Sequence, residues 1–388
     1  MSLTARVLQA FLRPAISSRP LADVILAMVE AMDAAGLPVD RASWSVPLLH
    51  PDVRAVQMIW RRGEGVEPIE RNWDANDAAP PQNPIRALLA GPGESIRARL
   101  GPGLGPHPWP ILDEFTLQGF TDYLVLLEPS PDPFERAAVS WATRAEGGWT
   151  EEQAQALVDL LPMITTFLRL EGQRRRGQGL LSTYLGVDAA TRVLEGRIRR
   201  GDLVDIDAAI SFCDLRGFTA ASSALSSAEL VAVLDEVFDA VVGAVEAEGG
   251  DVLKFIGDAV LAVFRGAPAE AAVRALRAAE GAGARLNITN VRRRASGRAP
   301  LEVGFGLHVG RASYGNVGGA HRLDFTVIGR DVNVASRVEG LCSRLGARLV
   351  ATEAFVFALG EEAPPDLEDA GDQTLKGVPE PVRVFMRR

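Results

Sequence analysis

The chain has 388 residues, of which 47% are apolar and 23% are charged, a composition typical of globular proteins with room for two domains. Its net charge of −9 argues against a nucleic-acid-binding protein, which normally presents a basic surface. Two cysteines argue against a disulfide framework, and no apolar run approaches the roughly 20 residues needed to cross a bilayer.

The first half is set apart by its aromatic content, since all six tryptophans precede residue 150. Residues 1–14 lack the apolar core and the small-residue cleavage site of a signal peptide, so we expect a short amphipathic helix there and a cytoplasmic location. Strands are predicted over 55–60 and 121–127. Thr150-Glu-Glu-Gln then fits a capping box, and the apolar spacing after it predicts a helix.

A mixed strand-and-helix region that ends in a long helix resembles a GAF-type sensor. We therefore predict an α/β, GAF-like regulatory domain at residues 1–170, controlled by an unknown small molecule or protein. A linker is expected at 171–204, with a connecting helix over 180–202. From Asp207 onward the pattern of strand, helix, hairpin, helix, strand and helix indicates an α/β or α+β domain around one central sheet.

The first segment with candidate chemistry is Ala208-Ala-Ile-Ser-Phe-Cys-Asp-Leu-Arg-Gly-Phe-Thr219, an apolar strand that ends on an acid before a glycine turn. Asp214, at the strand end, can hold a cation. The backbone amides at the start of the next helix, where Phe218 and Thr219 lie, can hold phosphate. Taken alone, a turn-capping role explains Asp214 equally well.

The second segment, Asp251-Val-Leu-Lys-Phe-Ile-Gly-Asp-Ala-Val-Leu-Ala-Val-Phe264, predicts two strands around a Gly257-Asp258 turn. Lys254 stands in an otherwise apolar strand, where an ammonium group without a partner is costly. Asp214 and Asp258 are too few to hold Mg²⁺ by themselves, because such sites are completed by water and substrate phosphates. The two acids therefore point to a nucleotide.

The third segment contains Val-Ile-Gly-Arg-Asp-Val-Asn-Val-Ala-Ser-Arg and predicts one helix from near Asp331 to Gly346. The face opposite its apolar stripe carries Asn333 and Arg337, four residues apart and so one above the other. An amide and a guanidinium that project together suit a ribose and a charged phosphate. A solvated polar face is the plainer interpretation of this segment by itself.

Together, Phe-Cys-Asp-Leu-Arg-Gly-Phe-Thr, Lys-Phe-Ile-Gly-Asp-Ala and the third segment resemble, in this order, the class III nucleotide cyclase domain over residues 205–388. The resemblance implies an α+β fold with a ferredoxin-like central antiparallel sheet and flanking helices. It also implies an adenylate cyclase that converts ATP to cyclic AMP and pyrophosphate. Asp214 and Asp258 would bind two Mg²⁺ or Mn²⁺ ions, while Asn333 and Arg337 would stabilise the transition state.

The resemblance extends to the substrate pocket. Lys254 occupies the purine-selecting position, where lysine implies adenine and an acid would imply guanine. Thr326 stands where many members carry the aspartate partner of that lysine, a combination typical of a bacterial lysine–threonine subclass. Lys376 matches the lysine that contacts the terminal phosphates. Gly304 departs from the pattern, because some members carry a phosphate-binding arginine there.

Members of this family build each site from two subunits, so we expect a homodimer with two equivalent sites. A guanylate cyclase is an alternative that Lys254 disfavours. A catalytically silent nucleotide-binding regulator is disfavoured because both metal aspartates and the arginine are present. Gly249-Gly-Asp251 resembles a diguanylate cyclase signature, but Val252 and Leu253 replace the required Glu-Phe. His308, between two apolar residues of a strand, is expected to be structural rather than a general base.

Overall fold

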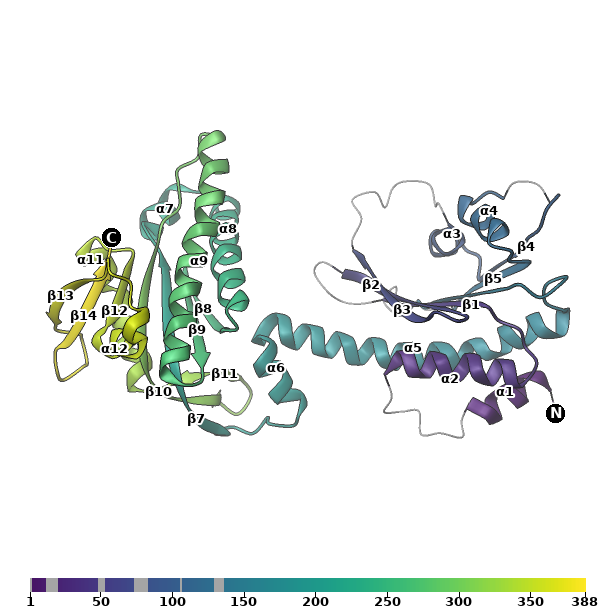
Figure 1. Ribbon diagram of the computed structural model, residues 1–388, viewed down its shortest axis with the longest axis horizontal. Helices are drawn as coiled ribbons and strands as arrows, with labels where there is room; N and C mark the ends of the chain where they lie inside the picture. The colour runs from purple at the N-terminus through teal and green to yellow at the C-terminus, as the bar shows by residue number, and fades with distance from the viewer. Residues whose placement is uncertain (1, 12–19, 48–52, 73–82, 105–106, 129–135) are drawn as a thin grey trace. The chain divides into compact units, whose positions relative to one another are not determined.

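The computed structural model of the protein describes residues 2–11, 20–47, 53–72, 83–104, 107–128 and 136–388. The chain divides into two units, Met1–Leu180 and Leu181–Arg388, each with its own sheet and its own hydrophobic core (Figure 1). None of the helices within these described ranges is long and apolar enough to cross a membrane.

A six-stranded sheet with the order β3-β2-β1-β6-β5-β4 forms the centre of the N-terminal unit. Its strands are β1 (Arg41–Pro47), β2 (Val53–Arg61), β3 (Gly65–Asn72), β4 (Ser95–Arg99), β5 (Asp122–Leu127) and β6 (Ala138–Thr143). The strands predicted at 55–60 and 121–127 are confirmed as β2 and β5. Every pair in this sheet is antiparallel, so α+β describes the unit more closely than the predicted α/β class.

Helices cover both faces of this sheet, which explains why β5 and β6 are buried along their whole length. The helices are α1 (Leu3–Phe11), α2 (Leu21–Ala34), α3 (Pro84–Ala90), α4 (Pro110–Leu117) and α5 (Glu151–Leu185). One core, around Met28, Trp141 and Leu157, joins α1, α2 and α5 to the sheet. A second core, around Leu112 and Val125, lies under α3 and α4 on the other face (Figure 1). The helix predicted in residues 1–14 is confirmed as α1.

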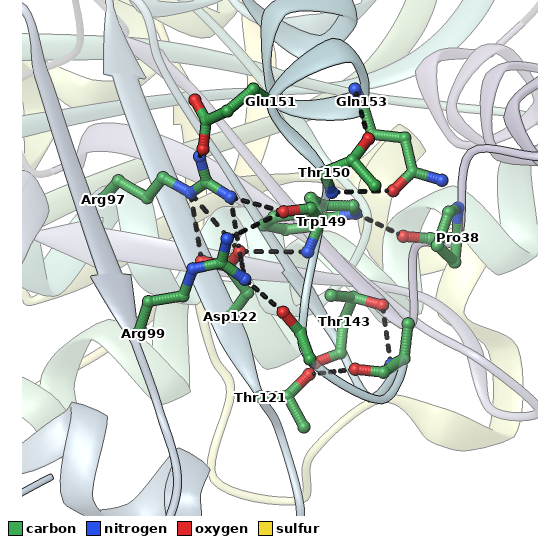
Figure 2. A network of polar contacts seen from close by, with 12 residues as sticks. Pro38, Arg97, Arg99, Thr121, Asp122, Thr143, Trp149, Thr150, Glu151 and Gln153 are labelled. Atoms are coloured by element: carbon green, nitrogen blue, oxygen red, sulfur yellow. Dashed lines mark hydrogen bonds and ion pairs between the residues drawn. The ribbon is translucent and has the colours of Figure 1, made fainter.

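A polar network around Asp122 ties β4 and β5 to the chain just before α5, as Figure 2 shows. The fully buried carboxylate of Asp122 accepts hydrogen bonds from the Arg97 guanidinium at 2.9 Å and from the backbone N–H of Trp149 at 3.1 Å. The Arg99 guanidinium lies 3.1 Å from the same oxygen. Because two cations and an amide surround this buried charge, its desolvation is compensated.

The capping box predicted at Thr150 is confirmed. Thr150 and Gln153 exchange hydrogen bonds of 3.0 and 3.2 Å between side chains and backbone amides. The helix ends at Leu185, where Gly186 takes a positive φ of 83° that favours glycine, and α6 (Val187–Leu194) follows. The single connecting helix predicted over 180–202 is therefore wrong, because the glycine breaks it into the end of α5 and a separate short helix.

The C-terminal unit has an eight-stranded sheet with the order β13-β14-β12-β10-β7-β9-β8, and β11 pairs with β10. The strands are β7 (Leu203–Leu215), β8 (Asp251–Ile256), β9 (Ala259–Arg265), β10 (Val303–Gly318), β11 (Leu323–Ile328), β12 (Leu349–Thr352), β13 (Glu368–Gln373) and β14 (Val382–Arg387). Only β12 runs parallel to its neighbour β10 among the paired strands described for this unit. The predicted mixed fold with a central, largely antiparallel sheet is confirmed.

The helices of this unit are α7 (Phe218–Ala224), α8 (Ser227–Ala247), α9 (Pro268–Ala295), α10 (Arg330–Glu339), α11 (Leu341–Leu345) and α12 (Glu353–Leu359). The helices α8 and α9 lie side by side on one face of the sheet, over a core that includes Val237 and Phe264 (Figure 1). The predicted single helix from near Asp331 to Gly346 is two segments that meet at Gly340.

Candidate functional site

Two strand ends bring a pair of acids together in the C-terminal unit. Asp214 is the second-last residue of β7, and Asp258 lies in the two-residue turn between β8 and β9. Cys213 of β7 is paired with Val260 of β9, so the register places Asp214 next to that turn. Both acids are partly buried, and their carboxyl groups share a hydrogen bond. The strands, the turn and the juxtaposition of these acids agree with the sequence prediction.

Negative charge accumulates at this pair. Burial, the hydrogen bond with Asp258 and the charge of Asp258 raise the pKa of Asp214 to about 6, while the backbone N–H of Leu215 and the nearby Arg216 oppose the shift without cancelling it. Glu339, at the end of α10, has its pKa raised to about 7 by burial and by Asp214. The charge of Arg216 therefore does not compensate for the burial and crowding of these carboxyl groups.

The acids fit a hard divalent cation. In the described part of the chain no group of three or more His, Cys, Asp or Glu side chains has the arrangement of a metal site. Asp214 and Asp258 offer oxygen ligands, which Mg²⁺ and Mn²⁺ prefer, and the remaining ligands of such a site come from water and substrate phosphates. The mutual repulsion that raises the pKa of Asp214 is the interaction that a bound cation removes.

Arg216 is a residue near this pair that the sequence analysis missed. Its guanidinium lies over Gly304 of β10, where a Cβ would come within 2.6 Å of Nη2. It donates to the carbonyl of Ala347 at 2.6 Å and to the hydroxyl of Ser343. Gly304 thus leaves room for the arginine that directly follows β7. The sequence signal that could have identified Arg216 is its position, two residues after the acid at the end of a strand.

Lys254 has a different partner from the residue that the sequence analysis placed near it. Its ammonium on β8 lies 2.5 Å from Oδ2 of Asp324 on β11, and this contact lowers the pKa of Asp324. Thr326 is two residues further along β11, paired with Gly315 of β10. Lys254 and Asp324 line the same cavity of about 700 Å³. The partner that an ammonium in a strand requires is therefore Asp324, which the sequence analysis missed.

Asn333 and Arg337 are both exposed on α10, while Val334 and Val338 of the same helix are buried. The predicted polar face is therefore confirmed. Within the described residues of a single chain, neither side chain has a hydrogen bond or ion pair to Asp214. One copy of the chain thus presents the acids and the α10 polar face as two separate groups.

The remaining predicted site residues lie at the start of α7 and in the turn between β13 and β14. Phe218 and Thr219 begin α7 directly after Gly217, which has a φ of 72°. Phe218 is partly buried against the core below α8, and Thr219 is exposed. Lys376 is exposed in the turn between β13 and β14. Each of these positions leaves a backbone amide or an ammonium near the surface.

Comparisons with known proteins concern mainly the C-terminal unit. Residues 205–386 match the family described as the adenylate and guanylate cyclase catalytic domain. An adenylate cyclase of Anabaena cylindrica is 36% identical over 148 residues, which cover 38% of this chain and 30% of that protein. Adenylate cyclase 1 of Rhizobium meliloti is 39% identical over 147 residues, which cover 37% of this chain and 22% of that protein. The chain therefore spans less than a third of either relative.

Among solved structures, a bacterial light-regulated adenylyl cyclase is similar with a TM-score of 0.50 and 23% sequence identity, over 59% of this chain and 65% of that chain. At this identity the likeness concerns the fold. The family match begins at residue 205, so the GAF-like assignment of the N-terminal unit stays a prediction.

Proposed function

The chain carries, at residues 205–386, a catalytic domain of the adenylate and guanylate cyclase family, and we propose that it is an adenylate cyclase that converts ATP to 3′,5′-cyclic AMP and pyrophosphate. The observation that supports this most is the contact between Asp214 at the end of β7 and Asp258 in the turn between β8 and β9, which, together with burial, raises the pKa of Asp214 to about 6. Structural acids are normally neutralised by arginine, lysine or backbone amides.

In the proposed reaction the ribose 3′-oxygen attacks the α-phosphorus of ATP, and pyrophosphate leaves. Asp214 and Asp258 would hold the divalent cations, two Mg²⁺ or Mn²⁺ ions, that the reaction needs. When bound, such cations lower the pKa of the 3′-hydroxyl and neutralise phosphate charge. Asn333 orients the ribose, and Arg337 donates to the oxygens of the reacting phosphate, where charge develops in the transition state.

Other residues of the chain bind the ends of the substrate. Lys376 meets the terminal phosphates, and the amides of Phe218 and Thr219 contact the phosphates at the start of α7. Lys254 donates to the N1 of adenine, which is an acceptor, whereas guanine carries a proton on N1. The chemistry of that contact and the names of both relatives favour ATP over GTP.

The site is proposed to be shared by two subunits. A single copy presents the acid pair and the α10 face without a bond between them. In a symmetric homodimer, the acids of one subunit face Asn333 and Arg337 of the other, and two equivalent sites result. Each copy needs one full set of residues for this arrangement, and the chain has one.

The N-terminal unit is proposed to regulate this site. Residues 1–170 would form the sensor, 171–204 the connector and 205–388 the catalytic domain. The unit has its own core, and α5, which begins within it at Glu151, ends at Leu185 beyond the boundary of that unit. A helix that continues from one unit into the other can transmit a change in the position of its start.

The product assay tests the proposed function. Purified full-length protein is incubated with ATP or GTP, in Mg²⁺ or Mn²⁺, and the nucleotide products are identified by mass spectrometry. We expect cyclic AMP from ATP, dependence on the metal, and a much lower rate with GTP. Cyclic GMP as the main product would make the protein a guanylate cyclase. If neither cyclic AMP nor cyclic GMP forms with either metal, the protein would instead be a nucleotide-binding regulator.

A further inference from the structure

The first turn of α10 is held to the sheet by an acid instead of a helix cap. Its N-cap residue is Gly329, which has no side chain to accept hydrogen bonds from the free N–H groups of the helix. Asp331, in that turn, accepts a hydrogen bond of 2.7 Å from the backbone N–H of Arg311 on β10. This bond fixes the start of the helix that presents Asn333 and Arg337.

Gly310 makes room for this carboxylate. A Cβ at Gly310 would collide with the carboxyl group of Asp331, because that group lies directly against the backbone of β10. The close approach leaves no space for a water or a side chain between the strand and the acid. The position of Asp331 is therefore set by β10 as well as by its own helix.

His308, two residues earlier on β10, faces the same carboxylate. Its side chain lies in the core, with the whole residue only 8% exposed, and its Nδ1 is 2.8 Å from the hydroxyl of Thr352 at the end of β12. Its Nε2 lies 3.7 Å from Oδ1 of Asp331 and has no hydrogen-bond partner among the described residues. Leaving a buried polar nitrogen without a hydrogen bond lowers the stability of the fold. The position of this nitrogen opposite a carboxylate therefore calls for an explanation.

The surroundings of the ring select one tautomer. The Thr352 hydroxyl accepts the backbone N–H of Phe355 at 3.3 Å, where it caps α12, and it can either donate to Nδ1 of His308 or accept from it. A bare Nε2 would instead set its lone pair against the Asp331 carboxylate, which favours the tautomer with its proton on Nε2. Burial lowers the pKa of His308, although Asp331 opposes the shift, and the ring is neutral at neutral pH. Its one proton then lies on Nε2, facing Asp331.

We propose that His308 and Asp331 form a pair of positioning residues: the ring N–H faces the carboxylate across 3.7 Å and restricts its position, the carboxylate holds the first turn of α10, and the helix presents Asn333 and Arg337 to the substrate. The inference rests on the proposed function for the role of the last two residues. His308 contacts neither substrate nor metal in this arrangement. Its contribution is to the rate, because a misplaced transition-state group lowers turnover more than substrate binding.

Two substitutions of the histidine separate its two contacts. His308→Asn places an amide where Nδ1 was, so the contact with Thr352 is kept and the group facing Asp331 is lost. His308→Gln places its amide nitrogen near the former Nε2 and keeps a donor facing Asp331. We expect His308→Asn to lower kcat about 10- to 100-fold with KM within about twofold, since misplacement by about 1 Å costs this much. His308→Gln retains kcat within about threefold of the wild type, a smaller loss on the same scale.

Asp331→Asn, in the full-length protein, tests the other half of the pair. It removes the charge that faces the ring, and we expect the same loss of kcat. The double variant His308→Asn, Asp331→Asn should be no slower than either single variant, because residues that act as a unit are not additive.

Asn290→Ala is the matched control for stability. Asn290 is a buried amide on α9 that exchanges hydrogen bonds of 2.7 and 2.8 Å with the backbone of Leu301. Its loss lowers the melting temperature and leaves kcat unchanged. Hydrogen exchange of the amides at 330–334 gives a second readout: it becomes faster in His308→Asn and stays as in the wild type in Asn290→Ala.

The outcomes decide between a positioning pair and an ordinary core residue. The inference is overturned if His308→Asn keeps kcat within about threefold of the wild type, a loss too small for a misplaced helix. It is also overturned if the Asn and Gln variants lose activity equally and only in proportion to stability. If the wild type makes no cyclic nucleotide, the proposed function fails, and exchange at 330–334 alone then decides whether His308 holds α10.

Discussion

The two units treat a buried carboxylate in opposite ways. Asp122 of the N-terminal unit is fully buried, with two arginines and a backbone N–H directed at it (Figure 2). Asp214 of the C-terminal unit is only partly buried, yet its nearest charged group is another carboxyl, and its pKa is raised to about 6. Within the described residues, the chain thus neutralises Asp122 with arginines, whereas Asp214 has another carboxyl as its hydrogen-bond partner.

We propose that this difference separates a structural acid from a functional one. A compensated carboxylate such as Asp122 stabilises the fold, and the size of this stabilisation depends on the hydrogen-bond and ion-pair partners that the chain supplies. An uncompensated pair such as Asp214 and Asp258 costs stability, which a cation bound between the two groups would restore. The same side-chain type thus takes part in packing in one unit and in the proposed chemistry of the other.

The largest expected effect is on activity. Asp214→Ala or Asp258→Ala should lower cyclase activity by at least about 10³-fold, because metal-ion stabilisation of the transition state amounts to several kcal/mol. Melting temperature and dimerisation should be retained, since neither acid forms an ion pair with a cationic side chain among the described residues. Asp239→Ala, at an exposed acid on α8, is the control and should be fully active. Activity within about tenfold of the wild type in either variant would be too high for a metal ligand.

The second-largest expected effect is a loss of stability when Asp122 is substituted. Asp122→Asn should cost about 3 kcal/mol, because two arginines lose their buried counter-charge. Denaturant unfolding followed by tryptophan fluorescence measures it selectively, since all six tryptophans precede residue 150. Asp214→Asn is the matched substitution in the other unit and should leave this transition unchanged. Equal losses in both variants would contradict the contrast between the two acids.

A smaller effect is expected at the exposed ion pair. Lys254→Glu should lower kcat/KM for ATP about 10-fold, because a hydrogen-bond donor to the purine is lost and an unmet polar group typically costs 1–3 kcal/mol. Folding should be little affected, since both partners of the Lys254–Asp324 pair are exposed and such pairs contribute little. Binding of triphosphate in the presence of metal should change less than turnover does. Unchanged ATP kinetics would show that Lys254 does not face the purine.

The smallest effect is a dependence of stability on pH. The folded pKa of Asp214, about 6, lies above its ordinary value of 3.8, so the folded state holds this proton more tightly than the unfolded state. The corresponding stability is present below pH 3.8 and is lost as the pH rises through 6. Glu339, with its pKa raised to about 7, acts in the same direction.

Calorimetry of the metal-free protein should therefore show less stability at neutral pH than near pH 5, apart from other titrating groups. Mg²⁺ should raise the melting temperature more at neutral pH than near pH 5, because only ionised carboxylates hold the metal. In Asp214→Asn this difference in the Mg²⁺ response should be reduced. An identical response in the variant and the wild type would show that the acid pair does not bind the metal.

Much of the C-terminal unit followed from local sequence signals. The hairpin around Asp258 and the exposed face with Asn333 and Arg337 were predicted because apolar spacing reports burial residue by residue. The breaks at Gly186 and Gly340 were not predicted, because a glycine inside an apolar pattern is compatible with either a continuous helix or its end.

The partners of the site residues were harder to predict than the residues themselves. Asp324 bonds Lys254 from 70 positions away, and Arg216, which directly follows β7, lies over Gly304, so strand register and not sequence spacing decides both contacts. Glu339 was missed for the same reason, because its proximity to Asp214 depends on how α10 packs on β7. Residue type and periodicity contain no information about such contacts.

A mixing experiment tests the central claim, a cyclase site shared by two subunits, most directly. Asp214→Ala and Arg337→Ala are each expected to be inactive as homodimers, because every site lacks either a metal ligand or the transition-state guanidinium. In a mixed dimer one site carries both lesions and the other carries neither, so mixing the two proteins should restore cyclic AMP production from ATP. Subunit exchange is checked with differently tagged copies. If exchange occurs and activity stays at the level of the single variants, the two groups do not form one site across a dimer.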